Sequence, residues 1–296
     1  MYIAVIVLIL LLVVFIYRES SGYNIVEYDI DTGKNIRPFR FVMISDLHDT
    51  DVTHDHNRRL IESIKAIDPD FVILAGDMIT SYLTRDRKSD NTSVFLKELA
   101  GSFKVYYGLG NHEQRYMEEP DRFPGRYKKL EDLIRSLGIE LLSDSYTDRD
   151  DNVRIYGLNI PLENYKRGLT PPLNEGIIEK TFGSVDDDHY NILIAHTPDH
   201  FDDYVKWRPD LVLCGHLHGG VIAIPGIGGL ISPQLKPFPK YDFGRYEKDN
   251  TTMIVSRGIG WHSIPIRIFN KAEIVSVRVG MTGKQTDQGE YDGDQC

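Results

Sequence analysis

The residues best suited to chemistry are Asp, Asn and His side chains that recur beside glycine at the ends of short apolar segments. They form five groups, Ser45-Asp46-Leu47-His48, Gly76-Asp77, Gly110-Asn111-His112-Glu113, His196 and Gly215-His216-Leu217-His218-Gly219. In the Asp-x-His and His-x-His patterns, the two outer side chains point the same way when the backbone is extended. The adjacent glycines leave room for sharp turns and for close approach of a substrate.

Seven of these side chains are candidate metal ligands: Asp46, His48, Asp77, Asn111, His196, His216 and His218. Seven nitrogen and oxygen donors are too many for one ion. They suit a pair of ions that lie about 3.5–4 Å from each other and share a bridging ligand. The mixture of imidazole, carboxylate and amide donors favours Mn, Fe or Zn over Ca or Mg. The pattern therefore predicts two divalent metal ions, with His112 as an additional histidine beside them.

Short apolar strands and amphipathic helices must position these groups. The patterning predicts strands at residues 24–30, 41–45, 71–75, 104–108, 154–157, 192–195, 211–214, 221–224, 253–256 and 274–279, and helices at 56–67, 92–100, 125–137 and 198–207. Helices that follow strands imply parallel pairing. Because ligands of open α/β sheets bind outside the carboxyl ends of the strands, the five groups are expected to converge on one cleft.

An apolar run precedes the rest of the chain. Residues 1–17 carry no charged side chain, and as a helix they would extend about 25 Å. A signal peptide is the alternative, but no Lys or Arg precedes the run and the following residues make a poor cleavage site. A buried helix fits badly because every face is apolar. We predict a single-pass anchor in the cell membrane, and we favour the extracytoplasmic face for the domain although Arg18 and Glu19 give little charge bias.

Composition describes a folded, acidic protein of 296 residues, with 26% charged residues, 41% hydrophobic residues and a net charge of −10. The acidic balance argues against a protein that coats nucleic acid. Two cysteines, Cys214 and Cys296, exclude a disulfide framework and a thiolate zinc cluster. We predict a transmembrane anchor at 1–19, a juxtamembrane lead at 20–37, one catalytic domain at 38–279 and a disordered acidic tail at 280–296.

Taken in order over residues 40–279, the five groups resemble the calcineurin-like metallophosphoesterase superfamily. The resemblance implies an α/β fold, a four-layer α-β-β-α sandwich, which here would follow an N-terminal transmembrane helix. It implies that Asp46, His48, Asp77 and His218 hold one metal, and that Asp77, Asn111, His196 and His216 hold the other, with Asp77 bridging. It also implies that Asn111, His112 and Glu113 serve catalysis: His112 would contact the phosphate or protonate the leaving group, and Glu113 would orient His112.

The resemblance implies a phosphoester hydrolase that uses a metal-bridging hydroxide, and we expect a phosphodiesterase. The anchor and the glycine-rich residues 215–220 resemble the membrane-associated bacterial phosphodiesterase branch, so a lipid or cell-envelope phosphodiester is one candidate substrate. The alternatives are a lipid-linked pyrophosphate hydrolase of the UDP-diacylglucosamine type, a phosphomonoesterase and a catalytically silent scaffold of the same fold. The intact His112 argues against the scaffold. Nothing in the sequence indicates an oligomeric state.

Residues 219–232 are apolar and interrupted by glycine and proline. We expect a strand followed by a buried loop. The alternative is an apolar lip that meets lipid, to which residues 259–262 and 264–268 would contribute a second part.

Overall fold

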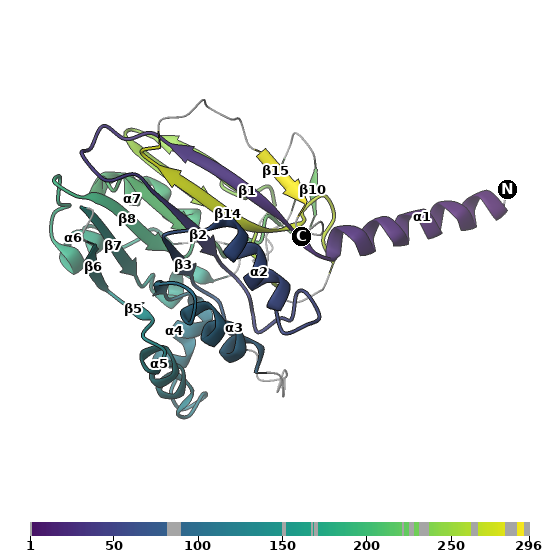
Figure 1. Cartoon of the computed structure of the whole chain (residues 1–296), viewed down its shortest axis with the longest axis horizontal. Helices are drawn as coiled ribbons and strands as arrows, with labels where there is room; N and C mark the ends of the chain where they lie inside the picture. The colour runs from purple at the N-terminus through teal and green to yellow at the C-terminus, as the bar shows by residue number, and fades with distance from the viewer. Residues whose placement is uncertain are drawn as a thin grey trace.

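Two β-sheets stack to form the centre of the molecule (Figure 1). The computed structural model describes residues 2–81, 90–149, 152–166, 168, 171–220, 222–224, 228–230, 237–261, 266–281 and 289–292. The larger sheet has the order β15-β1-β14-β2-β3-β4-β5 and the smaller one the order β12-β13-β9-β8-β7-β6. A separate two-stranded ribbon pairs β10 with β11.

The strands of the larger sheet are β1 (Tyr23–Ile30), β2 (Phe39–Ile44), β3 (Phe71–Ala75), β4 (Val105–Gly108), β5 (Glu140–Leu142), β14 (Ala272–Val279) and β15 (Gly289–Asp292). Those of the smaller sheet are β6 (Ser145–Arg149), β7 (Val153–Leu158), β8 (Tyr190–Ala195), β9 (Leu211–Cys214), β12 (Gly244–Lys248) and β13 (Thr251–Val255). The ribbon consists of β10 (Ala223–Ile224) and β11 (Gly228–Gly229). The helices are α1 (Tyr2–Ser20), α2 (Arg58–Ile67), α3 (Asn91–Ala100), α4 (Asn111–Glu118), α5 (Arg126–Ser136), η1 (Leu162–Tyr165), α6 (Ile177–Phe182), η2 (Pro198–His200) and α7 (Phe201–Trp207).

Apolar side chains from both sheets form the central core. Phe41 of β2 and Phe71 of β3 are stacked with ring centroids 5.4 Å apart, and they pack in one buried cluster with Ile192 of β8 and Leu213 of β9. Strands buried on both faces read as continuous apolar runs, which explains why these strands were recognisable in the sequence.

Helices cover the outer face of each sheet. Leu60 of α2, Phe95 of α3 and Ile134 of α5 are fully buried against the larger sheet. Ile178 of α6 and Tyr204 of α7 pack against the smaller sheet. The four layers are therefore helix, sheet, sheet and helix, and the predicted α-β-β-α sandwich is confirmed.

Parallel pairing places the carboxyl ends of the central strands together. β2, β3, β4 and β5 run parallel in the larger sheet, and β7, β8, β9 and β13 run parallel in the smaller sheet. The segments after β2, β3 and β4 therefore leave one edge of the larger sheet, and those after β8 and β9 leave one edge of the smaller sheet.

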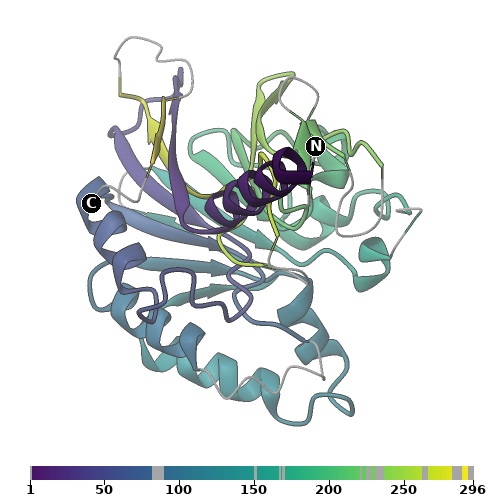
Figure 2. The same ribbon diagram turned by 90° about the vertical axis from the view of Figure 1, so that its right-hand side faces the viewer.

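Helix α1 projects away from the sandwich (Figure 1), and Figure 2 views the molecule from the end at which it emerges. It has 19 residues and buries none of them. By length and composition it is able to cross a membrane. The predicted apolar helix is thus present.

Several elements differ from the prediction for identifiable reasons. Helix α4 was not predicted because its sequence, NHEQRYME, lacks an apolar stripe and buries mainly polar residues. Strands β6 and β12 lie at the edges of the smaller sheet and carry charged side chains, which removes the apolar alternation of a buried strand.

The acidic tail also departs from its prediction. Gly289–Asp292 forms strand β15, which pairs antiparallel with β1, because the outer side of β1 would otherwise leave its backbone groups unpaired. The expectation of disorder is therefore wrong for these four residues, while residues 282–288 and 293–296 lie outside the described part.

Candidate metal centre

Two ligand-bearing loops are joined through their backbones at the edge of the larger sheet. The amide of Asp46, after β2, donates to the carbonyl of Gly76 at 3.0 Å, and the amide of His48 donates to the carbonyl of Asp77, after β3, at 3.0 Å. These bonds fix the two aspartates relative to each other before any ion binds. The sequence alone predicted that these segments converge, and the hydrogen bonds show how.

The backbone is left-handed at five of the predicted ligands, Asp46, His48, Asp77, His216 and His218, with φ between 51° and 72°. Such a conformation costs about 1–3 kcal/mol for each non-glycine residue and is concentrated at functional sites. The surrounding fold maintains it, and the turns direct the side chains inward.

The absence of a Cβ atom at Gly110 and Gly215 allows the carboxylates of Asp77 and Asp46 to lie close to the backbone. A Cβ at Gly110 would overlap Oδ1 of Asp77, and a Cβ at Gly215 would overlap Oδ2 of Asp46. Glycine is therefore required beside both carboxylates for a steric reason.

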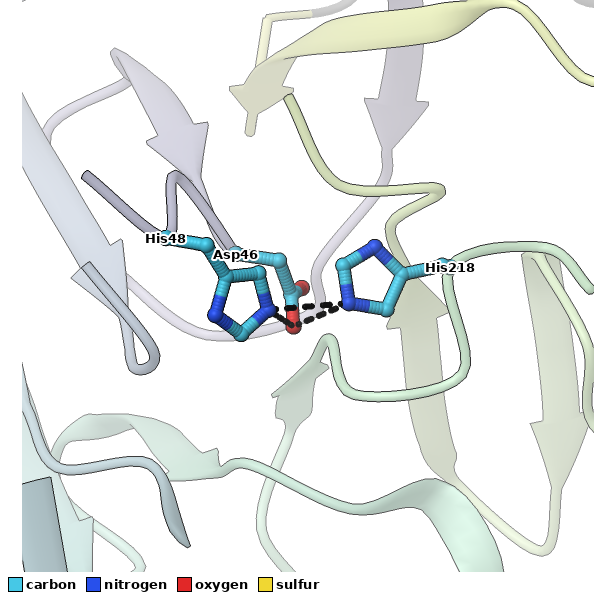
Figure 3. A group of neighbouring side chains, drawn as sticks. All are labelled: Asp46, His48 and His218. Carbon is cyan, nitrogen blue, oxygen red and sulfur yellow. Dashed lines mark hydrogen bonds and ion pairs between the residues drawn. The ribbon is translucent and has the colours of Figure 1, made fainter. Parts of the chain in front are cut away.

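The first ligand group consists of Asp46, His48 and His218, whose side chains point toward one another in Figure 3. The Nε2 atoms of the two histidines are 3.0 Å apart. Asp46 Oδ1 lies 3.4 Å from His218 Nε2 and 3.9 Å from His48 Nε2. All three residues are buried, so the group brings one carboxylate oxygen and two imidazole nitrogens to one point.

The second ligand group consists of Asp77, His196 and His216, which offer donor atoms within 4.8 Å of one another. His196 Nε2 is 3.1 Å from Asp77 Oδ2, and it also lies 3.8 Å from Asp46 Oδ1. Asp77 Oδ2 is in turn 4.0 Å from His48 Nε2. Asp77 thus stands between the two groups, where a shared ligand would be.

The amide of Asn111 tests whether this arrangement suits cations. Its side-chain oxygen faces only hydrogen-bond acceptors, and swapping the amide would put its nitrogen 2.9 Å from His216 Nδ1 and 3.3 Å from Asp77 Oδ2. Buried acceptors that face one another repel unless a proton or a cation lies between them. An amide oxygen, an imidazole nitrogen and a carboxylate oxygen are all suitable ligands for a divalent transition metal. The residues present therefore fit a metal ion at this point.

Neighbouring backbone groups orient the ligands. His196 Nδ1 lies 2.7 Å from the carbonyl of Ala75, and because a carbonyl only accepts, Nδ1 carries the proton and Nε2 is available as a ligand. The amide of His216 donates to the carboxylate of Asp46 at 3.0 Å. Such contacts set the tautomer and direction of metal-binding side chains.

Burial and neighbouring charges shift the pKa values of Asp46, Asp77 and His196 in different directions. Burial raises the pKa of the Asp46 carboxyl to about 7. Burial also opposes ionisation of Asp77, yet the imidazoles of His196 and His112 hold the pKa of Asp77 well below its usual value. Burial disfavours the charged form of His196, but Asp77 outweighs it and raises the pKa of His196 to about 10. A metal ion therefore has to displace protons from this cluster.

His112 occupies the first turn of α4 and is fully buried. Its Nδ1 accepts a hydrogen bond from the backbone amide of Ser81 at 2.7 Å, and Ser81 Oγ is 2.8 Å away. An amide only donates, so Nδ1 is unprotonated and Nε2 carries the proton of the neutral ring. That Nε2 lies 3.9 Å from Asp77 Oδ2, which places a proton donor beside the ligand cluster.

Glu113 forms hydrogen bonds with groups on either side of His112 in the fold. Within the described residues its carboxylate accepts from the amides of Gly110, Asp77 and Ile79 and from the hydroxyl of Tyr107, at 2.9–3.2 Å. It therefore holds the start of α4 against the loop after β3, as in half of a capping box. Ser81 forms hydrogen-bond contacts with the imidazole of His112 through its amide and Oγ.

Sequence reasoning missed Ser81, Arg115 and Tyr165. Arg115 lies one turn after Asn111 on α4, and its Nη1 is 3.5 Å from Ser81 Oγ. Among the described residues, no carboxylate forms an ion pair with Arg115. The ring of Tyr165, in η1, packs 4.9 Å from the ring of His216. The i,i+4 spacing from Asn111 could have revealed Arg115 if α4 had been predicted, whereas no sequence signal identifies Tyr165.

Comparison with known proteins agrees with this geometry. A family model described as calcineurin-like phosphoesterase matches residues 39–220. The chain belongs to this family. The predicted resemblance is thereby confirmed, and the fold and buried ligand groups are those of a metal-dependent phosphoester hydrolase.

Relatives of this family member occur in distant organisms. A transmembrane protein with a metallophosphoesterase domain from Danio rerio is 26% identical over 93% of this chain and 61% of that protein. The uncharacterized metallophosphoesterase YkuE of Bacillus subtilis is 27% identical over 80% of this chain and 77% of that protein. A solved structure of a dimetal phosphatase from Danio rerio covers 86% of this chain and 99% of that one, with 13% identity and a TM-score of 0.46. This chain thus spans less than two thirds of the Danio rerio transmembrane relative.

Proposed function

We propose that this calcineurin-like phosphoesterase is a membrane-anchored phosphodiesterase that works with two divalent metal ions. The observation that carries the proposal is the position of Asp77 between two buried ligand groups, with the protonated Nε2 of His112 beside it. We assign Asp46, His48, Asp77 and His218 to one ion, and Asp77, Asn111, His196 and His216 to the other. Mn, Fe or Zn suits this donor set.

The proposed mechanism divides the work between the ions and the chain. When bound, the ions would supply positive charge to the phosphate and hydroxide at neutral pH. His112 donates the proton on Nε2 to the departing oxygen, and Ser81 holds the ring in the required tautomer. Arg115 contributes positive charge next to Ser81 and His112, and Glu113 keeps the first turn of α4 in place.

A phosphodiester is the favoured substrate class. It carries a single negative charge, which the ions and Arg115 can balance, and it has an alkoxide leaving group that requires the proton of His112. The alternatives are a lipid-linked pyrophosphate of the UDP-diacylglucosamine type and a phosphomonoester. A catalytically silent scaffold is disfavoured because a partner-binding surface needs neither buried left-handed ligand residues nor a histidine with a fixed tautomer.

The test uses the full chain in detergent, loaded with Mn²⁺, Fe²⁺ or Zn²⁺ in turn. Hydrolysis of bis-p-nitrophenyl phosphate should exceed that of p-nitrophenyl phosphate, stop after chelation and return with metal, with Asp77→Asn as the inactive control. Hydrolysis that persists without metal would refute the dimetal proposal. Faster turnover of the monoester would show that the protein is a phosphomonoesterase and not a phosphodiesterase.

The membrane anchor is a separate part of the proposal. Helix α1 is long and apolar enough to span a bilayer, and the Danio rerio relative is named as a transmembrane protein. We expect the full chain to stay in the membrane pellet after carbonate extraction, with the domain on the extracytoplasmic face facing lipid or cell-envelope phosphoesters. Protease added to intact cells should digest an extracytoplasmic domain, and a protected domain would place it in the cytoplasm instead.

A further inference from the structure

The metal cluster and the emerging helix α1 lie at the same end of the larger sheet. β1 begins beside the start of β14, with Tyr23 paired to Ala272. β14 runs antiparallel to β2, and Val275 pairs with Met43, so β2 ends where β1 and β14 begin. Figure 2 looks onto this end of the molecule. A membrane that held α1 would therefore face the edge that carries Asp46 and its neighbours.

Helix α1 is attached to the domain by contacts beyond the chain connection. Ser20, the last residue of α1, accepts a hydrogen bond through Oγ from the amide of Arg267 at 2.9 Å. The ring of Phe15 packs against that of Phe269 with centroids 5.0 Å apart. Two contacts, separated by more than one helical turn, restrict how far the domain can tilt away from the helix axis.

Exposed apolar side chains surround this attachment. They are Ile222 (37% exposed), Ile224 (36%), Ile266 (40%) and Phe269 (51%), and together they are called the apolar rim below. The amide of Ala223 donates to the carbonyl of Ile268 at 3.0 Å, so the two segments that carry the rim lie side by side. Ile222 and Ile224 fall in the expected strand, of which Ala223–Ile224 forms β10, whereas most of the expected loop, residues 225–227 and 231–236, and residues 262–265 lie outside the described part.

Hydrogen bonds connect the segment that carries Ile266 and Phe269 to the loops of the first ligand group. The guanidinium of the buried Arg267 donates to the carbonyls of Gly258 and Gly260 at 3.1 and 2.7 Å, and the amide of Gly260 donates to the carbonyl of Asp46 at 2.9 Å. Nδ2 of Asn270 donates to the carbonyl of His218 at 2.7 Å. Two residues of the first ligand group are therefore held by the segment that carries Ile266 and Phe269.

We infer that the apolar rim inserts into the same lipid bilayer that holds α1, so that the sheet edge carrying the ligand groups lies at the level of the lipid headgroups. The inference rests on the proposed anchor. Phe15 precedes Ser20 by five residues, about 7 Å along the helix at about 1.5 Å per residue. With Ser20 at the membrane surface, the contact with Phe15 would place Phe269 at this depth, which matches the roughly 5–10 Å insertion of interfacial apolar faces.

The lipid bilayer is the occupant that the contacts favour over a protein partner. A bilayer around α1 reaches Phe269 without further assembly, because the two rings already touch. A substrate that lies in the headgroup layer would then be close to the ligand groups without leaving the membrane, whereas a soluble protein partner would have to displace lipid from the base of α1.

The experiment measures contact with lipid in the full chain, reconstituted in nanodiscs. Cys296 is changed to Ser, and Cys214 is buried and does not label. An environment-sensitive fluorophore is attached to Ile224→Cys, Ile266→Cys, Leu10→Cys in the middle of α1, or Tyr146→Cys as a control. Tyr146 is 48% exposed on β6, which Figure 1 shows at the far side of the domain from α1. Each sample is compared in ordinary lipid and in lipid with brominated acyl chains.

Bromine should quench the labels at Ile224 and Ile266 about twofold or more, as expected for insertion at the interface, and should leave the Tyr146 label unchanged. Unquenched labels at Ile224 and Ile266 together with a quenched Leu10 label would overturn the rim insertion while leaving the anchor intact. An unquenched Leu10 label would show that α1 does not span the bilayer, and would overturn the anchor and the rim insertion together.

Discussion

The assignment of His112 as the proton donor predicts the behaviour of a single substitution, His112→Asn. The Asn side chain can place its amide oxygen near the position of Nδ1 and still accept from the amide of Ser81. It removes the Nε2 proton that lies beside Asp77. The change therefore separates proton donation from the local structure that the imidazole supports.

The expected loss follows from the role of a general acid. Such a group contributes about 10²–10⁴ in rate, which is about 3–5 kcal/mol of barrier. For an alkyl phosphodiester, whose leaving group needs the proton, His112→Asn should lose this full factor. For the p-nitrophenyl ester of the same phosphate, which departs readily as an anion, the loss should be about tenfold or less.

His112→Ala is the matched control for stability. Ser81 is buried, and the Ala variant leaves its amide without an acceptor, which costs about 1–3 kcal/mol. The Ala variant should therefore unfold at a lower temperature than the Asn variant, while the two lose similar activity. Both should retain wild-type metal content, because Nδ1 is committed to Ser81 and Nε2 carries a proton.

The assay compares kcat on the two esters and metal content by elemental analysis. An equal loss on good and poor leaving groups would refute proton donation and leave His112 with a phosphate-positioning role. Loss of about one metal per chain in His112→Asn would instead make His112 a ligand.

Three further predictions concern the ligands and their surroundings. Asp77→Asn should lose both metals and all measurable hydrolysis, whereas Asn111→Ala should lose metal only partly; elemental analysis of the two variants side by side checks this, and equal metal loss would remove the bridging role of Asp77. Arg115→Ala should raise KM for a diester about tenfold, about 1.4 kcal/mol of binding, with little change in kcat, and Arg115→Lys should recover part of it; an unchanged KM would show that Arg115 does not touch the substrate. Metal binding should release protons, because the metal-free chain holds one on His196, whose pKa is about 10, and part of one on Asp46, whose pKa is about 7. Calorimetry in buffers of different ionisation enthalpy should show a proton release that falls as the pH is raised through the pKa of Asp46, with affinity rising with pH; a release that does not change with pH would contradict the shifted pKa values.

Local sequence patterns were sufficient for much of the architecture. The central strands, such as Phe71–Ala75, are buried on both faces and therefore appear as uninterrupted apolar runs. The amphipathic helix α2 shows its buried face as Leu60, Ile61 and Ile64. The edge strands β6 and β12 and the polar helix α4 carry no such pattern, because the two strands place charged side chains at the sheet edges and α4 buries mainly polar residues.

The candidate ligands were visible in the sequence because their chemistry is local. Asp46-x-His48, Asn111-His112 and His216-x-His218 combine metal-binding side chains with glycine at the ends of strands, and parallel pairing makes such ends converge. Residue type and order were therefore enough to predict the donor set and the family resemblance, without any knowledge of distances.

Only the tertiary structure decided how these residues work together. Ser81 contacts His112 across 31 positions of sequence and sets its tautomer, and Glu113 binds the backbone amides of Asp77 and Gly110. The proximity of Arg267 to the ligand loops, and of Phe269 to α1, likewise results from the pairing of β1, β14 and β2. Sequence determines which groups are available because each side chain carries its own chemistry, whereas their roles depend on contacts between distant segments that form only when the sheets pack.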